Sequence, residues 1–190
     1  MITRLRRLSK SLLRPVAEVM AKNGITGNSL TLTGLVLSLT FPAFIYFKFY
    51  VEAIIIVVVA SLFDAFDGEV ARIRKEAGKK GSFLDSVSDR IEDLSYVTGL
   101  FFLGLPPLLL ILLAGTSVII SYVRAKAESL GVALEGKGIV ERGERLLFVV
   151  IIVVLYLLFL PATLPVLYIF VILSCATVVQ RILLGVKAIH

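Results

Sequence analysis

The longest stretch without a charged residue, residues 146–180, constrains the fold of this chain more than any other feature. A membrane-spanning helix needs roughly 20 mostly apolar residues. This stretch is therefore too long for one span, and Pro161 and Pro165 are expected to divide it into two. With 58% hydrophobic residues and a mean hydropathy of +0.96, the chain is far more apolar than a soluble domain. Further apolar segments cover residues 30–47, 53–63 and 94–103, and another span is expected over residues 108–127.

These segments predict an all-α polytopic membrane protein with six transmembrane helices in residues 28–190. The second expected helix, residues 52–75, is apolar in its first half only, and the third, from Gly81, is apolar in its second half. Residues 78–81, Gly-Lys-Lys-Gly, are expected to form the tight turn that joins these two helices. No repeat, linker or second domain is visible, so residues 1–190 are expected to form a single membrane domain.

The first 22 residues alternate basic and apolar side chains at helical spacing. They predict an amphipathic helix that lies on an anionic membrane surface, with a solvated basic tail as the alternative. Eighteen of the 20 Lys and Arg residues lie in four places: residues 1–22, 72–80, 124–145 and the C-terminus. By the positive-inside rule, both termini of this cell-membrane protein are expected to be cytoplasmic, together with the polar halves of the second and third helices.

All five aspartates of the chain lie between positions 64 and 93. Asp64 and Asp67 share one face of a helix, and Asp85 and Asp89 share one face of the next. Ionised groups at membrane depth are costly, so this cluster is expected to face a wet cavity and to be balanced by cations. Carboxylates at this density suggest Mg²⁺, Mn²⁺ or Ca²⁺, which are hard cations that prefer oxygen ligands.

The surroundings of the aspartates suggest a site for a phosphate-containing ligand. Gly68 and Ala71 leave room beside the helix backbone, and Arg72 can hold a phosphate through two N–H groups. An alternative is a buried network of ion pairs in a cation-coupled transporter. Such a transporter would carry polar groups through to the outer side of the membrane, whereas the outer halves of these helices are nearly featureless. A non-catalytic lipid-binding membrane protein is a further alternative.

The pattern Asp-x₂-Asp-Gly-x₂-Ala-Arg-x₈-Gly-x₃-Asp-x₃-Asp, from Asp64 to Asp89, resembles the signature of the CDP-alcohol phosphotransferases. The resemblance implies a dimeric enzyme that moves a phosphatidyl-type group from a CDP-lipid to an alcohol and releases CMP. It implies that the four aspartates hold two divalent ions, Mg²⁺ or Mn²⁺, and that Asp89 is also the general base. The CDP-binding residues implied are Asn28, Thr31, Asp64, Gly68, Ala71 and Arg72. The proline that usually precedes the asparagine is here Gly27.

A second cationic group is expected where the fourth to sixth helices end on the cytoplasmic side. Ser121 and Arg124 share one helix face, and Arg145 and Arg181 belong to the two helices that follow. Arginines from three helices can form a pocket for a phosphomonoester, although ordinary loop charge explains any one of them equally well.

The strings around these residues are Ser-Tyr-x-Arg-Ala-x-Ala-Glu and Glu-Arg-x-Glu-Arg. They resemble the phosphatidylinositol-phosphate and archaetidylinositol-phosphate synthases. That resemblance implies that Ser121, Arg124, Arg145 and Arg181 hold the phosphate of inositol 1-phosphate, with CDP-archaeol or CDP-diacylglycerol as the donor. Glycerol 3-phosphate would satisfy the same pocket and remains the alternative acceptor. Membrane lipids are expected partners and nucleic acids are not.

Overall fold

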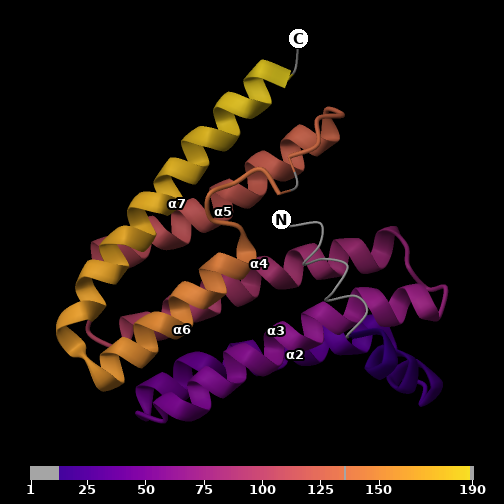
Figure 1. Cartoon of the computed structure of the whole chain (residues 1–190), viewed down its shortest axis with the longest axis horizontal. Helices are drawn as coiled ribbons and strands as arrows, with labels where there is room; N and C mark the ends of the chain where they lie inside the picture. The colour runs from indigo at the N-terminus through magenta and orange to yellow at the C-terminus, as the bar shows by residue number, and fades with distance from the viewer. Residues whose placement is uncertain (1–12, 135, 189–190) are drawn as a thin grey trace. The chain divides into compact units, whose positions relative to one another are not determined.

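The computed structural model describes residues 13–134 and 136–188, and all regular secondary structure in that part of the chain is helical. Residues 13–22 form a first helical segment, and residues 1–12 of the predicted interfacial helix lie outside the described residues. Six longer helices follow (Figure 1): α2 Gly27–Tyr46, α3 Tyr50–Ile73, α4 Lys79–Phe101, α5 Pro107–Ser129, α6 Arg142–Leu158 and α7 Leu160–Ala188.

The membrane prediction holds in part. Within the described residues, α2, α5 and α7 are long and apolar enough to cross a membrane. The helix α6 is shorter, with 17 residues, and α3 and α4 carry too many charged side chains to count as clear spans by length and composition. The structure therefore shows a helical protein with three clear candidate spans, and the count of six remains a prediction.

Two predicted boundaries are wrong. The break between α6 and α7 lies at Phe159, and both Pro161 and Pro165 lie inside α7, within its first two turns. The chain reverses between α3 and α4 over residues 74–78, which share only Gly78 with the predicted turn at residues 78–81, and Gly81 already belongs to α4. The left-handed backbone conformation in this reversal falls on Lys75, with φ 59°.

The helices form two compact units, each described by itself. The first unit contains the described residues up to Thr40 together with Ile55–Glu92, and the second contains Phe41–Ile54 and the chain from Asp93 onwards. Helices α2, α3 and α4 thus each contribute one part to each unit.

The first unit is organised around the start of α2. Thr26 caps this helix: the Ser29 backbone N–H donates to Thr26 Oγ1, and the Thr26 backbone N–H lies 3.1 Å from Ser29 Oγ. Leu30 of α2 packs with Ala17 and Val70 in a buried core. At the end of α3, Arg74 donates to the backbone oxygen of Ala21, which ties α3 to the segment 13–22. The core of this unit thus holds α2 against α3.

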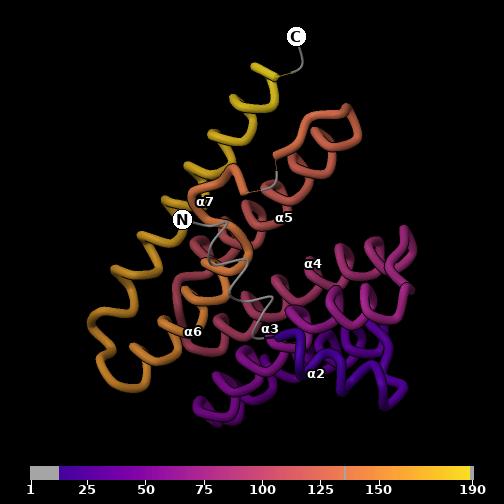
Figure 2. Tube along the Cα trace, turned by 45° about the vertical axis from the view of Figure 1, so that its right-hand side comes forward, coloured from indigo at the N-terminus to yellow at the C-terminus, as the bar shows by residue number. Residues whose placement is uncertain are grey.

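In the second unit, α7 packs along both α5 and α6 (Figure 2). Phe148 of α6 stacks on Phe170 of α7, with ring centroids 4.6 Å apart. On α4, Gly99 makes room for the Phe41 ring, because a Cβ at Gly99 would lie 2.3 Å from a carbon of that ring. Close packing of apolar side chains therefore holds together the helices on which the arginines of this unit lie.

Candidate active site

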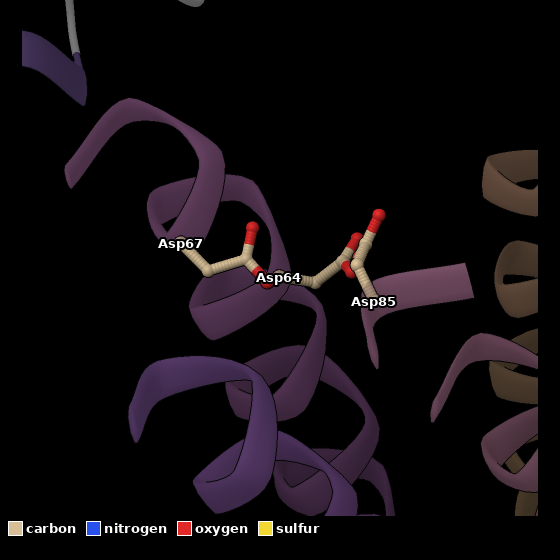
Figure 3. A group of neighbouring side chains, drawn as sticks. All are labelled: Asp64, Asp67 and Asp85. Atoms are coloured by element: carbon tan, nitrogen blue, oxygen red, sulfur yellow. The ribbon is translucent and has the colours of Figure 1, made fainter. Parts of the chain in front are cut away.

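Three of the predicted aspartates converge in the first unit. Asp64 and Asp67 lie one turn apart on α3, and Asp85 lies in the second turn of α4. One carboxylate oxygen from each lies within 4.8 Å of the others (Figure 3). Three hard oxygen ligands at this spacing suit Mg²⁺ or Mn²⁺. The convergence predicted from helical spacing is therefore observed for these three residues.

Asp67 is the most enclosed of the three, with 7% of its surface exposed. Thr31 Oγ1 of α2 lies 2.6 Å from Asp67 Oδ2 and 3.1 Å from the backbone oxygen of Gly27. The Thr31 hydroxyl thus orients the Asp67 carboxylate by a hydrogen bond, as residues next to metal ligands commonly do. Thr31, predicted as a nucleotide contact, is here the residue that orients Asp67.

Gly27 allows α2 to approach α3 this closely. A Cβ at Gly27 would lie 2.7 Å from the backbone oxygen of Asp67 and 2.9 Å from the Ala71 Cβ. A proline, which also has a Cβ, would meet the same atoms. Close packing of α2 against α3 therefore explains the glycine at this position. The small side chain of Ala71 allows this helix contact and also lines the adjacent cavity.

A cavity of about 210 Å³ opens beside the carboxylates. Its volume is many times that needed for one water molecule. All but one of the predicted CDP-binding residues line it, together with Asp85 and the loop before α4. These predicted residues are Asn28, Thr31, Gly68, Ala71 and Arg72, and the predicted metal ligand Asp67 lines the cavity as well. The exception is Asp64, which is not among its lining residues although its carboxylate belongs to the cluster.

Two glycines shape this cavity. A Cβ at Gly81 would lie 3.3 Å from Asn28 Oδ1, so the first turn of α4 comes close to the Asn28 side chain. A Cβ at Gly68 would lie 3.5 Å from Arg72 Nη1. Glu69 holds the Arg72 guanidinium through hydrogen bonds of 2.6 and 3.2 Å. The Arg72 guanidinium thereby lies at the cavity, next to the backbone of Gly68, which has no side chain to cover it.

Asp89 is not among the three converging carboxylates. Its Oδ2 accepts a hydrogen bond of 2.9 Å from Arg90 Nη2, and 16% of its side chain is exposed. The structure thus places the predicted base outside the group of three and next to a cation. Its roles as fourth metal ligand and as base stay predictions.

The four predicted acceptor residues lie in the second unit, and the arginines among them are ion-paired. Arg124 donates to Glu128, and Ser121 donates to the backbone oxygen of Ser117. Arg145 and Arg181 are buried. Arg145 donates to Asp93 at 2.9 Å. Arg181 donates to both oxygens of Glu141, at 2.6 and 2.7 Å, and to the backbone oxygen of Ile120.

Sequence comparison decides the family. The profile of the family described as CDP-alcohol phosphatidyltransferase matches residues 25–182. The chain belongs to this family. The resemblance drawn from the aspartate pattern is thereby confirmed, and the match covers the whole region from the loop before α2 to the C-terminal part of α7.

Members of this family from archaea and bacteria are similar to the chain over most of its length. An archaetidylinositol phosphate synthase of Aeropyrum pernix is 37% identical over 74% of this chain and 72% of that protein. One from Pyrococcus horikoshii is 35% identical over 96% of this chain and 95% of that protein. The crystal structure of Mycobacterium tuberculosis phosphatidylinositol phosphate synthase with CDP-DAG bound superposes with a TM-score of 0.81, at 28% identity, over 92% of this chain and 94% of that one.

A second structure of the mycobacterial enzyme was solved in complex with manganese and citrate. It superposes with a TM-score of 0.79 at 28% identity, covering 91% of this chain and 88% of that one. The mycobacterial enzyme with this fold was thus solved with manganese, a metal that suits the donor set found at Asp64, Asp67 and Asp85.

The sequence interpretation missed two carboxylates, Asp93 and Glu141. Asp93 follows Asp89 by four residues, as Asp89 follows Asp85, so the same spacing marks it. Glu141 lies in the string that was interpreted for its arginines alone. Both residues form ion pairs with predicted phosphate-binding arginines, and only the tertiary structure shows which arginine each one meets.

Proposed function

We propose that this protein joins inositol 1-phosphate to a CDP-activated lipid and releases CMP, on the cytoplasmic side of the cell membrane. The donor is CDP-archaeol or CDP-diacylglycerol. The observation that carries the proposal is the convergence of Asp64, Asp67 and Asp85 beside a cavity lined by most of the residues predicted to bind the nucleotide. The inositol-phosphate synthases among its relatives support the choice of acceptor.

The carboxylate cluster fits a divalent metal centre. Asp64, Asp67 and Asp85, completed by Asp89, would hold two ions of Mg²⁺ or Mn²⁺. When bound, such ions neutralise charge on the non-bridging oxygens of the donor diphosphate and so favour displacement at phosphorus. Thr31 keeps the Asp67 carboxylate oriented toward the cluster.

The chain's own residues position the CDP end of the donor. Asn28 presents its amide at the cavity, and Arg72, held by Glu69, offers a planar cation to a phosphate. Gly68 and Ala71 have no side chain or a small one, so the nucleotide can lie close to the backbone of α3. The cytidine and its phosphate thus have a place beside the carboxylates.

Asp89 is the proposed base. It takes the proton of the acceptor hydroxyl while the hydroxyl oxygen bonds to the phosphorus that carries the lipid. The bond from that phosphorus to the bridging oxygen of the diphosphate breaks, and CMP leaves with the bridging oxygen and its electron pair. Arg90 holds the Asp89 side chain by a direct ion pair. The protein contains a single histidine, His190, outside the described residues, so a carboxylate is the natural choice of base here.

The proposed acceptor site consists of Ser121, Arg124, Arg145 and Arg181. Arg124 is the most accessible of the three arginines, with 40% of its side chain exposed. A phosphate dianion can share a guanidinium with a carboxylate, because the guanidinium offers five N–H donors. The buried pairs of Arg145 and Arg181 would thus orient the two cations for the phosphate.

The charge distribution supports a six-span arrangement with both termini cytoplasmic and residues 1–22 on the membrane surface. We propose a homodimer, as the family resemblance implies.

Release of CMP by the purified protein tests the function. The protein is given a CDP-lipid and Mg²⁺ with inositol 1-phosphate, inositol or glycerol 3-phosphate in separate reactions. Release with inositol 1-phosphate alone is the expected result. Release only with glycerol 3-phosphate would leave the aspartate site in place and replace the acceptor. Absence of release with all three acceptors would count against the transferase and favour the cation-coupled transporter.

A further inference from the structure

Asp93 has no role in the aspartate signature, yet it is among the most buried charged residues of the second unit. Only 5% of its side chain is exposed, and the side chain of its partner Arg145 is 6% exposed. Ionised groups at such depth are costly unless they are paired and hydrogen-bonded. The contacts of this buried carboxylate should therefore explain its presence.

Asp93 joins three helices through one oxygen atom. Its Oδ2 accepts a hydrogen bond of 2.9 Å from Arg145 Nη2 of α6 and one of 3.1 Å from Ser117 Oγ of α5. The Ser117 residue is itself buried, with 3% of its surface exposed. Two donors on one oxygen fix the direction of the carboxylate, and the carboxylate in turn fixes the guanidinium.

The position of Arg145 argues against a role for this ion pair in stabilising the N-terminus of α6. Arg145 lies in the first turn of α6, four residues after the N-cap residue Glu141. The N-terminal end of a helix carries partial positive charge and disfavours a cation there. Asp93 brings a negative charge to the buried Arg145 guanidinium at that positive end. Moreover, buried ion pairs often add little to stability compared with apolar packing.

We infer that Asp93 is the positioning residue of the acceptor site: it holds the Arg145 guanidinium, with Ser117 as its second anchor, so that Arg145 meets the acceptor phosphate in a fixed orientation. This inference rests on the proposed function, which gives Arg145 its phosphate. Asp93 itself touches no substrate. It acts through Arg145 as a carboxylate acts on a metal-bound histidine, by orienting the group that binds.

Steady-state kinetics in detergent test the inference with four variants. Asp93→Asn keeps the volume and removes the charge, and Arg145→Gln removes the guanidinium. A double variant combines the two. Glu144→Gln is the matched control: it neutralises a carboxylate at the N-terminus of α6, where glutamine preserves the capping interaction with the Glu141 backbone.

The expected result is a change in the KM for the acceptor without a matching change in the KM for the donor. Asp93→Asn raises the KM for inositol 1-phosphate about ten- to a hundredfold, since a hydrogen bond to a charged group is lost. The KM for the CDP-lipid stays close to the wild type, while the Tm falls because a buried charged partner is lost. The double variant has the same acceptor KM as Arg145→Gln alone, because Asp93 acts through that arginine. Glu144→Gln leaves both KM values within about twofold.

Three results would overturn the inference: equal changes in both KM values, a lower Tm with unchanged KM values, or additive effects in the double variant. Where Asp93→Asn does not fold, Ser117→Ala replaces it. This variant keeps the ion pair and removes one anchor, and it is expected to raise the acceptor KM alone by about two- to tenfold.

Failure of the proposed function has a different signature. A wild-type enzyme that uses glycerol 3-phosphate and not inositol 1-phosphate disproves the proposed acceptor, and the same variants then test Asp93 with glycerol 3-phosphate. A wild-type enzyme that uses only acceptors without a phosphate would overturn both.

Discussion

Replacement of Gly27 by alanine tests whether the contact between α2 and α3 sets the geometry of the nucleotide site. The new methyl group would lie 2.7 Å from the Asp67 backbone oxygen and 2.9 Å from the Ala71 Cβ. Ordinary contact begins at 3.4 Å, so the start of α2 must move by about 0.7 Å. Neither neighbour is a flexible side chain that can turn away. Overpacking of this kind costs about 1–3 kcal/mol in the free energy of unfolding.

The displacement carries Asn28 and Thr31 with it, since both belong to the first two turns of α2. We expect the KM of Gly27→Ala for the CDP-lipid to rise about ten- to a hundredfold, because a misplacement approaching 1 Å is enough for an effect of this size. The KM for inositol 1-phosphate should change little.

Gly115→Ala provides the matched control for this prediction. Gly115 lies inside α5, and a Cβ there meets no atom within 4 Å. The control should keep both KM values and gain a few tenths of a kcal/mol to about 1 kcal/mol in stability. CMP release at varied donor concentration and thermal unfolding in detergent measure both effects. A Gly27→Ala protein with the wild-type donor KM and Tm would refute the reasoning.

Three further variants, one of them with a control variant, separate the proposed roles. Asp89→Asn should abolish turnover and leave CDP-lipid affinity, measured by calorimetry, nearly intact; retained turnover would exclude Asp89 as the base. Thr31→Val removes the hydroxyl that holds Asp67 and should raise the Mg²⁺ concentration for half-maximal activity about tenfold, and an unchanged metal titration would exclude the orienting role. Arg124→Ala should raise the KM for inositol 1-phosphate far more than that for the donor, whereas Glu128→Ala, which removes its partner, should not; equal effects of Arg124→Ala on both substrates would contradict the acceptor site.

The aspartate site could be predicted from the sequence because its information is local. Helical spacing places Asp64 and Asp67 on one face, and a short reversal brings Asp85 of the next helix to them. The glycines at 78 and 81 predict the reversal a few residues too late, because Lys75 takes the left-handed conformation that glycine would favour.

Contacts between distant segments could not be predicted in this way. Nothing in the spacing shows that Gly27 lies against Asp67, or that Asp93 pairs with Arg145 across 52 residues of chain. Such pairings depend on which helix faces meet, and apolar stripes on membrane helices leave that choice open. The same limit applies to the arginines, whose shared charge predicted one pocket while the structure gives each its own carboxylate.

The most direct test of the account is the mass of the lipid product. The purified protein is incubated with a CDP-lipid, Mg²⁺ and inositol 1-phosphate, and the extracted lipids are analysed by mass spectrometry. The account predicts a lipid that carries inositol and two phosphates, one from the donor and one from the acceptor. It also predicts that this product disappears with a metal chelator or with Asp85→Asn. A product that carries inositol with a single phosphate, or one formed equally well in the chelator, would contradict the central claim.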